Sequence, residues 1–544
     1  MIHLSPLRLG LIILIPIVIF SWYRSSVQQL PLIRDASIET LQQHLSDGTL
    51  TSEHLVRTYL ARISEVNDEI HAVAETNPDA LIIARHLDQE RRISGPRSVL
   101  HGIPILVKDS ISAHGMNNTA GSYCLEGAKT KMEASVISKL RDAGAIILGK
   151  TNMSQWGNAR SVNSSNGWSS WGGQTYGVYV MGQDPCGSSS GSATSIAMGL
   201  VAAAVGAETV GSITCAAMKS NIVSIKPTAA LVAKDNVIVS QRRGSLGPMT
   251  STVRDAALLL NFMAGRSESD PLTINIPFKH YPDYLASCDT KALRNSRIGI
   301  PRNGLKNPIG SGINTTAIMQ AFEDAVSLLR RNGATIIDNV NYPKYDDLYR
   351  SSPQSIFGPA EYKFDITQYF KNLSTNPHNI HNINDVIACS KSHPKEEFPF
   401  RDIVNLEKAA AAPDLDTPEV LNALKEMEFL GGEGGIDGAL KAADADALIL
   451  PSVICSDVPG FVGYPVITVP MGFLPTDTPV TKNPRKDLID EAPNVPFGLC
   501  FIGTALSEEK LIGLAYSFEQ LTKVASQRSP IVLPKTELRD MRGN

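Results

Sequence analysis

The sequence has no excess of charge of either sign. Its 544 residues include 50 Lys and Arg against 54 Asp and Glu, so the formal net charge is −4. A nucleic-acid-binding protein usually carries a clustered basic excess, and a disordered chain has few apolar residues, whereas apolar residues make up 43% here. The composition therefore predicts a soluble, globular body with no nucleic-acid partner.

Cysteine and histidine are not paired at metal-binding spacings. None of the seven cysteines belongs to a Cys-x-x-Cys pair or to a Cys/His cluster, so we expect no metal site. An odd number at irregular spacing favours buried thiols, with a disulfide framework as the alternative. The cysteines are Cys124, Cys186, Cys215, Cys288, Cys389, Cys455 and Cys500.

The sequence also lacks an apolar run long enough to span a bilayer. Residues 9–22 carry no charge, but at about 1.5 Å per residue they reach about 21 Å of the roughly 30 Å required. This favours a signal peptide within residues 1–28. No small-x-small cleavage site follows, so an uncleaved membrane anchor or a buried helix are alternatives. We expect a secreted or membrane-anchored glycoprotein with Asn-x-Ser/Thr triplets at Asn117, Asn152, Asn163, Asn314 and Asn372.

Helical and strand-like patterns alternate through residues 29–544, which we interpret as a single domain. Residues 37–94 repeat apolar positions at helical spacing, and 102–111 reads as a buried strand that ends at Lys108. A helix followed by a strand is predicted at 133–152, 316–340 and 438–452, and a last helix at 507–523. This order predicts an α/β/α sandwich around a mixed, mostly parallel twisted sheet, with irregular insertions around 265–290 and 341–435.

Two serine-rich segments stand out. "CGSSSGSATSIAMGL" (186–200) leads from Ser188 into a predicted helix of about 13 residues that starts at Ser192, and "VGAETVGSITCAAMKSN" (205–221) contains Ser212. A helix and a short turn or strand between them would return the chain to the same edge of the sheet. We place Ser212 at a helix start, where backbone N–H groups favour negative charge.

A serine nucleophile needs a base, and no histidine lies in or next to these segments. The nearest are His101 and His114, whereas Lys108 ends an apolar strand. Burial can lower a lysine pKa to about 7 to 8, which makes a serine–lysine arrangement sufficient for acyl transfer. Taken singly, Lys108 reads as a strand-end lysine, the Ser/Gly run as a linker and Ser212 as a helix cap. The hypothesis of serine–lysine catalysis rests on Lys108 and the two serine-rich segments occurring together, in this order and at this spacing.

The same residues lie in motifs that resemble the amidase signature family over nearly the whole chain after the leader. The Ser-rich form "CGSSSGS" is similar to a branch frequent among fungal amidases. The matching segments are "GIPILVKDS" around Lys108, "GKTNMSQWGN" (149–158), "CGSSSGSA" (186–193), "GAETVGSITC" (206–215), "IKPT" (225–228), "GPMTSTVRDAALLL" (247–260) and "YPVITVPMGF" (464–473).

The resemblance implies an amidase that needs no cofactor and releases an acid with an amine or ammonia. It implies a Ser-cisSer-Lys triad of Lys108, Ser188 and Ser212, with a cis peptide bond before Ser188 and an acyl-enzyme on Ser212. The resemblance further implies an oxyanion hole and substrate-binding residues at Thr209, Val210, Gly211, Ser212 and Ser189.

Several residues depart from the family pattern. Val210 stands where relatives often have Gly, or Asp in the Ser-rich branch. Thr214 replaces a frequent Arg, and Ala216 replaces a frequent Pro. A β-branched Val210 would be unfavourable if that position needs a positive φ. Arg242 and Arg243 read either as site electrostatics or as solvated loop arginines.

These departures keep two other functions open. One is a membrane-associated fatty-acid-amide-type hydrolase that attaches through residues 9–22, and the other is a catalytically impaired binding protein with the same fold. A role as a tRNA-linked amidotransferase subunit is disfavoured by the leader. The partner we expect is a small-molecule amide, and a homodimer is left open.

Overall fold

The computed structural model describes residues 30–306 and 315–541. The chain from Pro31 onward forms one compact unit. The leader predicted at 1–28 and the triplet at Asn314 lie outside the described residues. Within the described residues, no helix has both the length and the apolar content needed to cross a membrane.

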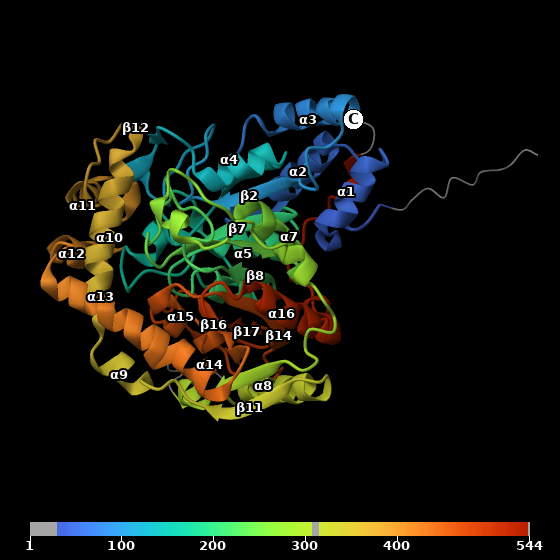
Figure 1. Cartoon of the computed structure of the whole chain (residues 1–544). Coiled ribbons are helices and arrows are strands. Elements are labelled where there is room, and N and C mark those ends of the chain that lie inside the picture. Colours follow the sequence, from blue (N-terminus) through green and yellow to red (C-terminus); the bar gives the residue numbers. More distant parts are fainter. Residues whose placement is uncertain (1–29, 307–314, 542–544) are drawn as a thin grey trace, which may run out of the picture. The chain divides into compact units, whose positions relative to one another are not determined.

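A mixed sheet of 11 strands runs through the unit, and helices pack on both of its faces (Figure 1). Four neighbouring pairs are parallel and six are antiparallel, so the sheet is mixed as expected but less parallel than the sequence predicts. In sheet order the strands are β1 (Val73–Thr76), β4 (Ile146–Thr151), β2 (Pro104–Lys108), β7 (Ala203–Glu208), β9 (Ser245–Thr250), β8 (Val223–Lys226), β14 (Val466–Phe473), β17 (Pro496–Ile502), β13 (Ala447–Pro451), β10 (Arg297–Pro301) and β11 (Thr335–Val340).

The central strands form where the sequence has short apolar runs without alternation. Every residue of β2, β4 and β7 is buried, as expected for strands covered on both faces. The predicted helix–strand units are present, and β2 pairs in parallel with both neighbours, β4 and β7. Two parallel crossovers thus bring the end of β2 next to the end of β7.

The helices begin and end near the predicted boundaries in the N-terminal part. Ser37 and Thr51 cap α1 and α2 by accepting hydrogen bonds from the backbone N–H groups of Thr40 and His54. The helices are α1 (Ile38–Ser46), α2 (Ser52–Ile70), α3 (Ala80–Ser94), α4 (Ser135–Asp142), α5 (Ser190–Ala197), α6 (Thr214–Lys219), α7 (Val253–Met263), α8 (Thr315–Arg331), α9 (Tyr345–Arg350), α10 (Pro353–Lys371), α11 (Ile383–Ser392), α12 (Val404–Ala411), α13 (Pro418–Gly431), α14 (Asp437–Ala443), α15 (Asp457–Val462) and α16 (Glu508–Thr522).

The helix predicted from Ser192 is shorter than expected. It ends at Ala197, and Ala203 and Ala204 belong to β7 instead. Alanine favours helix in isolation, but the place between β2 and β9 in the sheet overrides that preference. The turn between α5 and β7 is what returns the chain to the sheet.

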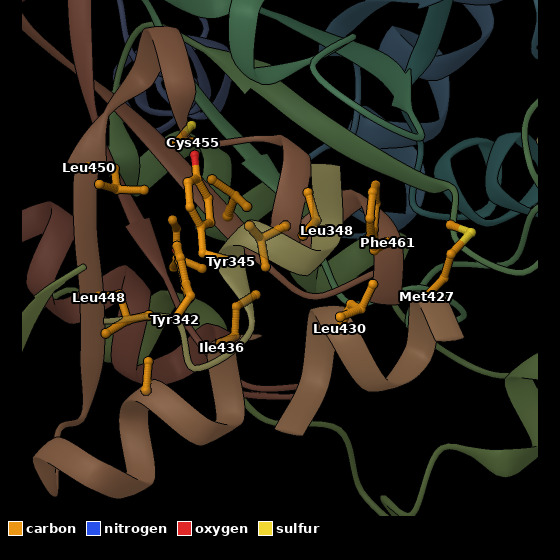
Figure 2. Close-up of a cluster of buried hydrophobic side chains, with 14 of the residues drawn as sticks. Tyr342, Tyr345, Leu348, Met427, Leu430, Ile436, Leu448, Leu450, Cys455 and Phe461 are labelled. Atoms are coloured by element: carbon orange, nitrogen blue, oxygen red, sulfur yellow. The ribbon is translucent and has the colours of Figure 1, made fainter. Parts of the chain in front are cut away.

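The prediction of an irregular insertion around 341–435 is wrong, because this segment contains the five helices α9 to α13. The gold and orange ribbons of α10 to α13 are grouped in Figure 1, and α10 contacts both α12 and α13. Side chains of α9 and α13 pack with Leu448 and Leu450 of β13 in one buried cluster (Figure 2). Apolar residues at helical spacing were hidden by frequent Pro, Asn and Tyr.

Six of the seven cysteines form disulfides, which corrects the expectation of buried thiols. The Cα atoms of each pair lie 5.8 to 6.2 Å apart, within the range for a disulfide, and the pairs are 29 to 265 residues apart in sequence. Sequence spacing therefore gave no sign of the pairing. The pairs are Cys124–Cys389, Cys186–Cys215 and Cys455–Cys500, and Cys288 is free.

Candidate active site

Lys108 lies at the end of β2, in the middle of the buried part of the sheet. Its Nζ atom is 2.7 Å from Ser188 Oγ and 2.8 Å from the carbonyl oxygen of Ala207, to which it donates. Burial lowers the pKa of the Lys108 ammonium to about 7, and the negative charge of Glu208 opposes that shift. The lowered pKa therefore makes the neutral side chain, which can accept a proton, accessible near pH 7.

Ser188 lies directly before α5 and joins Lys108 to Ser212. The Gly187–Ser188 peptide bond is cis. The Ser188 backbone carbonyl accepts a hydrogen bond from the Ser154 N–H at 3.1 Å, and Ser188 Oγ is 3.0 Å from Ser212 Oγ. The three side chains thus form one continuous hydrogen-bonded row.

Ser212 is the outermost member of this row. It lies in the turn between β7 and α6, and it is 8% exposed, against 2% for Lys108 and 1% for Ser188. Because all three line the same cavity and Ser212 is the most accessible, a substrate reaches Ser212 most easily.

The turn that carries Ser212 is held by the buried carboxylate of Glu208. This carboxylate accepts hydrogen bonds from the backbone N–H groups of Gly211, Ile213 and Thr214, and from the Thr214 hydroxyl. Thr214 is thus part of the support of the turn. Glu208 lies inside the motif "GAETVGSITC", but its role was not predicted, because sequence spacing does not show which backbone N–H groups a carboxylate will bind.

This support corrects one predicted oxyanion donor. The Gly211 N–H is engaged by Glu208, whereas the N–H groups of Thr209, Val210 and Ser212 donate to no other group within the described residues. The positive φ of 76° in the turn falls on Gly211, and Val210 is not among the positive-φ residues. The β-branched side chain at 210 therefore meets no conformational obstacle.

Ser189 does not belong to the cavity, which corrects its assignment as a substrate-binding residue. Its hydroxyl donates to the Ala207 carbonyl and accepts from the Ala207 N–H, both at 3.2 Å. Its backbone N–H donates to the Ser212 carbonyl at 2.9 Å. Ser189 therefore fastens α5 to β7 and to the Ser212 turn.

The two histidines nearest to the motifs in sequence have no part in the cavity. His101 is fully buried and hydrogen-bonds through Nε2 to the Leu87 carbonyl, and His114 is exposed. Lys108 is therefore the base within reach of the serines.

Arg243 and Arg242 differ, so the alternative of two solvated arginines holds for Arg242 alone. Arg242 is exposed, whereas Arg243 is buried, lines the cavity and donates to Glu361 Oε2 at 2.6 Å. Arg243 also donates to Gln354 Oε1 at 2.7 Å, and its guanidinium lies over the Phe357 ring. It thereby joins the loop before β9 to α10.

The cavity in front of Ser212 has a volume of about 610 Å³. The cavity is lined by the hydrogen-bonded row of Lys108, Ser188 and Ser212 and by the apolar side chains of Trp156, Val162 and Ile238. A further part of the lining, which we name the opposite wall, comes from α10 and α12, and its polar residues were missed because these helices were not predicted. Those polar residues include Gln354, Glu361, Asp365 and Lys408.

The charged residues of the opposite wall are not fully paired. Glu361 is matched by Arg243, while burial and the neighbouring Glu361 carboxylate raise the pKa of Asp365 to about 7. Across the described ranges, no group of three or more His, Cys, Asp or Glu side chains could hold a metal ion.

Comparison with known proteins places these features in a family. The family model described as Amidase matches residues 54–512. A protein from Arthroderma benhamiae that carries an amidase name is 41% identical over 503 residues, covering 92% of this chain and 84% of that protein. A probable amidase from Arabidopsis thaliana is 34% identical over 502 residues, covering 90% and 91%.

Solved structures agree with the sequence comparison. The native peptide amidase from Stenotrophomonas maltophilia superimposes with a TM-score of 0.81 at 36% identity, covering 91% of this chain and 98% of that chain. The chain therefore belongs to the amidase signature family and is a hydrolase that acts on C–N amide bonds.

Proposed function

We propose that the protein hydrolyses a carboxylic amide through an acyl-enzyme on Ser212, with Ser188 as proton relay and Lys108 as base. The observation that carries this proposal is the continuous row from Lys108 Nζ to Ser188 Oγ and Ser212 Oγ, with distances of 2.7 and 3.0 Å. The lowered pKa of Lys108 supplies the neutral amine that the row needs at its buried end.

The first half of the reaction forms the acyl-enzyme. Neutral Lys108 takes the proton of Ser188 while Ser188 takes the proton of Ser212, and Ser212 Oγ attacks the amide carbon. The electron pair of the C=O bond moves to oxygen, where the N–H groups of Thr209, Val210 and Ser212 stabilise it.

The second half releases the products. The electron pair on oxygen re-forms the C=O bond as the C–N bond breaks, and Lys108 returns its proton through Ser188 to the departing nitrogen. Water then attacks the ester of Ser212 and passes its proton through Ser188 to Lys108, which later returns it to Ser212 Oγ as the acid leaves.

We further propose a polar, peptide-sized amide as substrate rather than a fatty one. The wall formed by α10 and α12 places Gln354, Glu361 and Asp365 in the cavity, and a long acyl chain would have to bury itself against these charges. The likeness to a peptide amidase supports the same choice. The intact row of Lys108, Ser188 and Ser212 argues against a binding protein that has lost catalysis.

The compartment follows from the cysteines as a proposal. Disulfides persist in oxidising environments, so the three pairs support an origin in the secretory pathway, in agreement with the leader expected at 1–28. Of the predicted glycosylation triplets, Asn163 and Asn372 are exposed. Asn152 is 1% exposed and cannot carry a glycan, which corrects that part of the prediction.

The test combines turnover with active-site labelling. Amides of graded acyl length and aromaticity are assayed for released amine or ammonia, and a fluorophosphonate probe reports the reactive serine. Ser212→Ala should abolish both signals. Ser195→Ala is the matched control, because the Ser195 hydroxyl in α5 is buried and has no hydrogen-bond partner among the described residues. Normal hydrolysis by Ser212→Ala would defeat the proposal.

A further inference from the structure

The Cys186–Cys215 disulfide spans the two segments that carry the catalytic serines. Cys186 lies two residues before Ser188, and Cys215 lies three residues after Ser212. Their separation of 29 residues is the shortest of the three disulfide pairs. Each cysteine lies within a serine motif, although the triad chemistry uses neither.

The two segments are supported to different degrees. Four hydrogen bonds to the carboxylate of Glu208, the last residue of β7, hold the Ser212 turn in place. Ser188 follows the long segment 159–187, whose strands β5 (Trp168–Ser169) and β6 (Gly173–Gln174) have two residues each. The segment before Ser188 thus has little regular structure, and its end is held by local hydrogen bonds, from the Cys186 N–H to Asp184 Oδ1 and from Ser190 Oγ to the Cys186 carbonyl.

Few direct interactions connect the Ser212 turn to Ser188 and its neighbours. Besides the hydrogen bond between the two hydroxyls, the Ser189 N–H donates to the Ser212 carbonyl at 2.9 Å. The disulfide is the covalent link, and it attaches Cys186 to the first turn of α6. It therefore limits how far Ser188 can move from Ser212 Oγ.

The disulfide is open to a reagent from a cavity that Lys108, Ser188 and Ser212 do not line. Both cysteines are partly exposed and line a second cavity of about 500 Å³, and Val210 lines both this cavity and the one that contains Ser212. The Cys455–Cys500 pair is buried at 1% and 0% exposure, and Cys124 is buried at 1%. Of the three disulfides among the described residues, Cys186–Cys215 is thus the one in which neither cysteine is buried.

We propose that the Cys186–Cys215 disulfide is a positioning element that holds Ser188 in register with Ser212, and that its reduction by a dithiol slows hydrolysis. The proposal rests on the proposed role of Ser212 as nucleophile. The cysteines are not among the residues that line the cavity containing Ser212, so they act through the two serines.

The reductive step is ordinary thiol–disulfide exchange. A thiolate of the dithiol attacks one of the two sulfurs, and the other leaves as a thiolate and takes a proton. The second thiol of the dithiol then displaces the remaining protein sulfur, which also takes a proton. The protein gains two electrons and two thiols, and the dithiol becomes a cyclic disulfide.

The first test compares two double variants. Cys186→Ala/Cys215→Ala should react with a fluorophosphonate, and turn over the best amide, about tenfold to a hundredfold more slowly than the wild type, with KM little changed. The matched control, Cys124→Ala/Cys389→Ala, also loses a disulfide but should keep the wild-type rates. Both are measured well below their unfolding temperatures. Wild-type labelling by the first variant would overturn the proposal.

The second test needs no substitution, so it holds if the first variant does not fold. The wild-type protein is treated with increasing dithiothreitol, the free thiols are alkylated, and mass spectrometry identifies which pair has opened. The labelling rate should fall as Cys186 and Cys215 become alkylated, while circular dichroism stays unchanged. A labelling rate equal to that of the untreated protein, with Cys186–Cys215 reduced, would equally reject the proposal.

The two proposals fail in different ways. If Ser212→Ala still hydrolyses amides, the proposed function is wrong. If Ser212→Ala is inactive but loss of Cys186–Cys215 leaves the rates unchanged, the proposed function stands and the positioning role is wrong.

Discussion

The two walls of the cavity are built from different parts of the chain and are held in place by different interactions. The catalytic wall comes from the ends of β2 and β7 and the start of α5, where the polar groups of Lys108, Ser188 and Glu208 are buried and hydrogen-bonded. The opposite wall comes from α10 and α12, which the Arg243–Glu361 ion pair joins to the rest of the unit. We therefore expect changes at Lys108 or the two serines to act mainly on turnover, and loss of the Arg243–Glu361 pair to act mainly on stability.

The largest expected effect is on the catalytic wall. Lys108→Ala removes the proposed base, so we expect kcat to fall by about 10²-fold to 10⁴-fold. Lys226→Ala is the control, because Lys226 is also fully buried but donates to the Tyr464 carbonyl and does not line the cavity. An equal loss of kcat in both variants, measured as amine release, would remove the distinction between the two lysines.

The next effect tests the opposite wall through stability. Arg243→Leu leaves the Glu361 carboxylate buried without its cation, so the unfolding free energy should fall by about 3 to 5 kcal/mol. Denaturant titration measures this change. Arg242→Leu, at the exposed neighbour, should have little effect, and Arg243→Leu/Glu361→Leu should recover much of the loss. If the double variant is no more stable than Arg243→Leu, the ion pair is not the cause.

A smaller effect on both properties is expected at Glu208. Glu208→Gln replaces an acceptor oxygen with an amide NH₂ that faces backbone N–H groups, which should lower the unfolding free energy by about 1 to 3 kcal/mol. Because the same turn carries Ser212, kcat should fall by about tenfold to a hundredfold. The exposed Glu433→Gln serves as control for the change of charge. Unaltered kcat in Glu208→Gln would show that the turn keeps its shape without this support.

The smallest effect is a shift of rate with pH. Lys108 must be neutral to act as base, so kcat/KM should be low below its pKa of about 7 and should rise as pH increases through that value. Asp365, on the opposite wall, titrates in the same range. Asp365→Asn should therefore keep the rise near pH 7. If the rise disappears in that variant, the opposite wall and not the catalytic one controls the pH profile.

Much of the catalytic wall was predictable because its residues lie in short segments of distinct composition. The strand that ends at Lys108 and the serine motifs around Ser188 and Ser212 were placed from the sequence, and the structure brings them together. The length of α5 was overestimated, because alanine in β7 was assigned to the helix. Local composition identifies such segments but does not fix where each one ends.

The opposite wall was not predictable in the same way. Asp365 and Glu361 lie in α10, within a segment whose Pro, Asn and Tyr content indicated irregular chain. Arg243 could be read as solvated until its burial against Glu361 and Phe357 was seen. These assignments depend on contacts between residues more than 100 positions apart, as for Arg243 and Glu361, 118 positions apart.

The sequence by itself determined the family and the presence of a large α/β core, and it singled out Lys108, Ser188 and Ser212, which the structure joins in one hydrogen-bonded row, because these depend on local pattern and residue chemistry. Tertiary structure alone decided which cysteines pair, which N–H groups near Ser212 remain open, and which charges face the cavity. The physical reason is that disulfides, ion pairs and burial depend on distances in space, and the number of residues between two positions does not determine those distances.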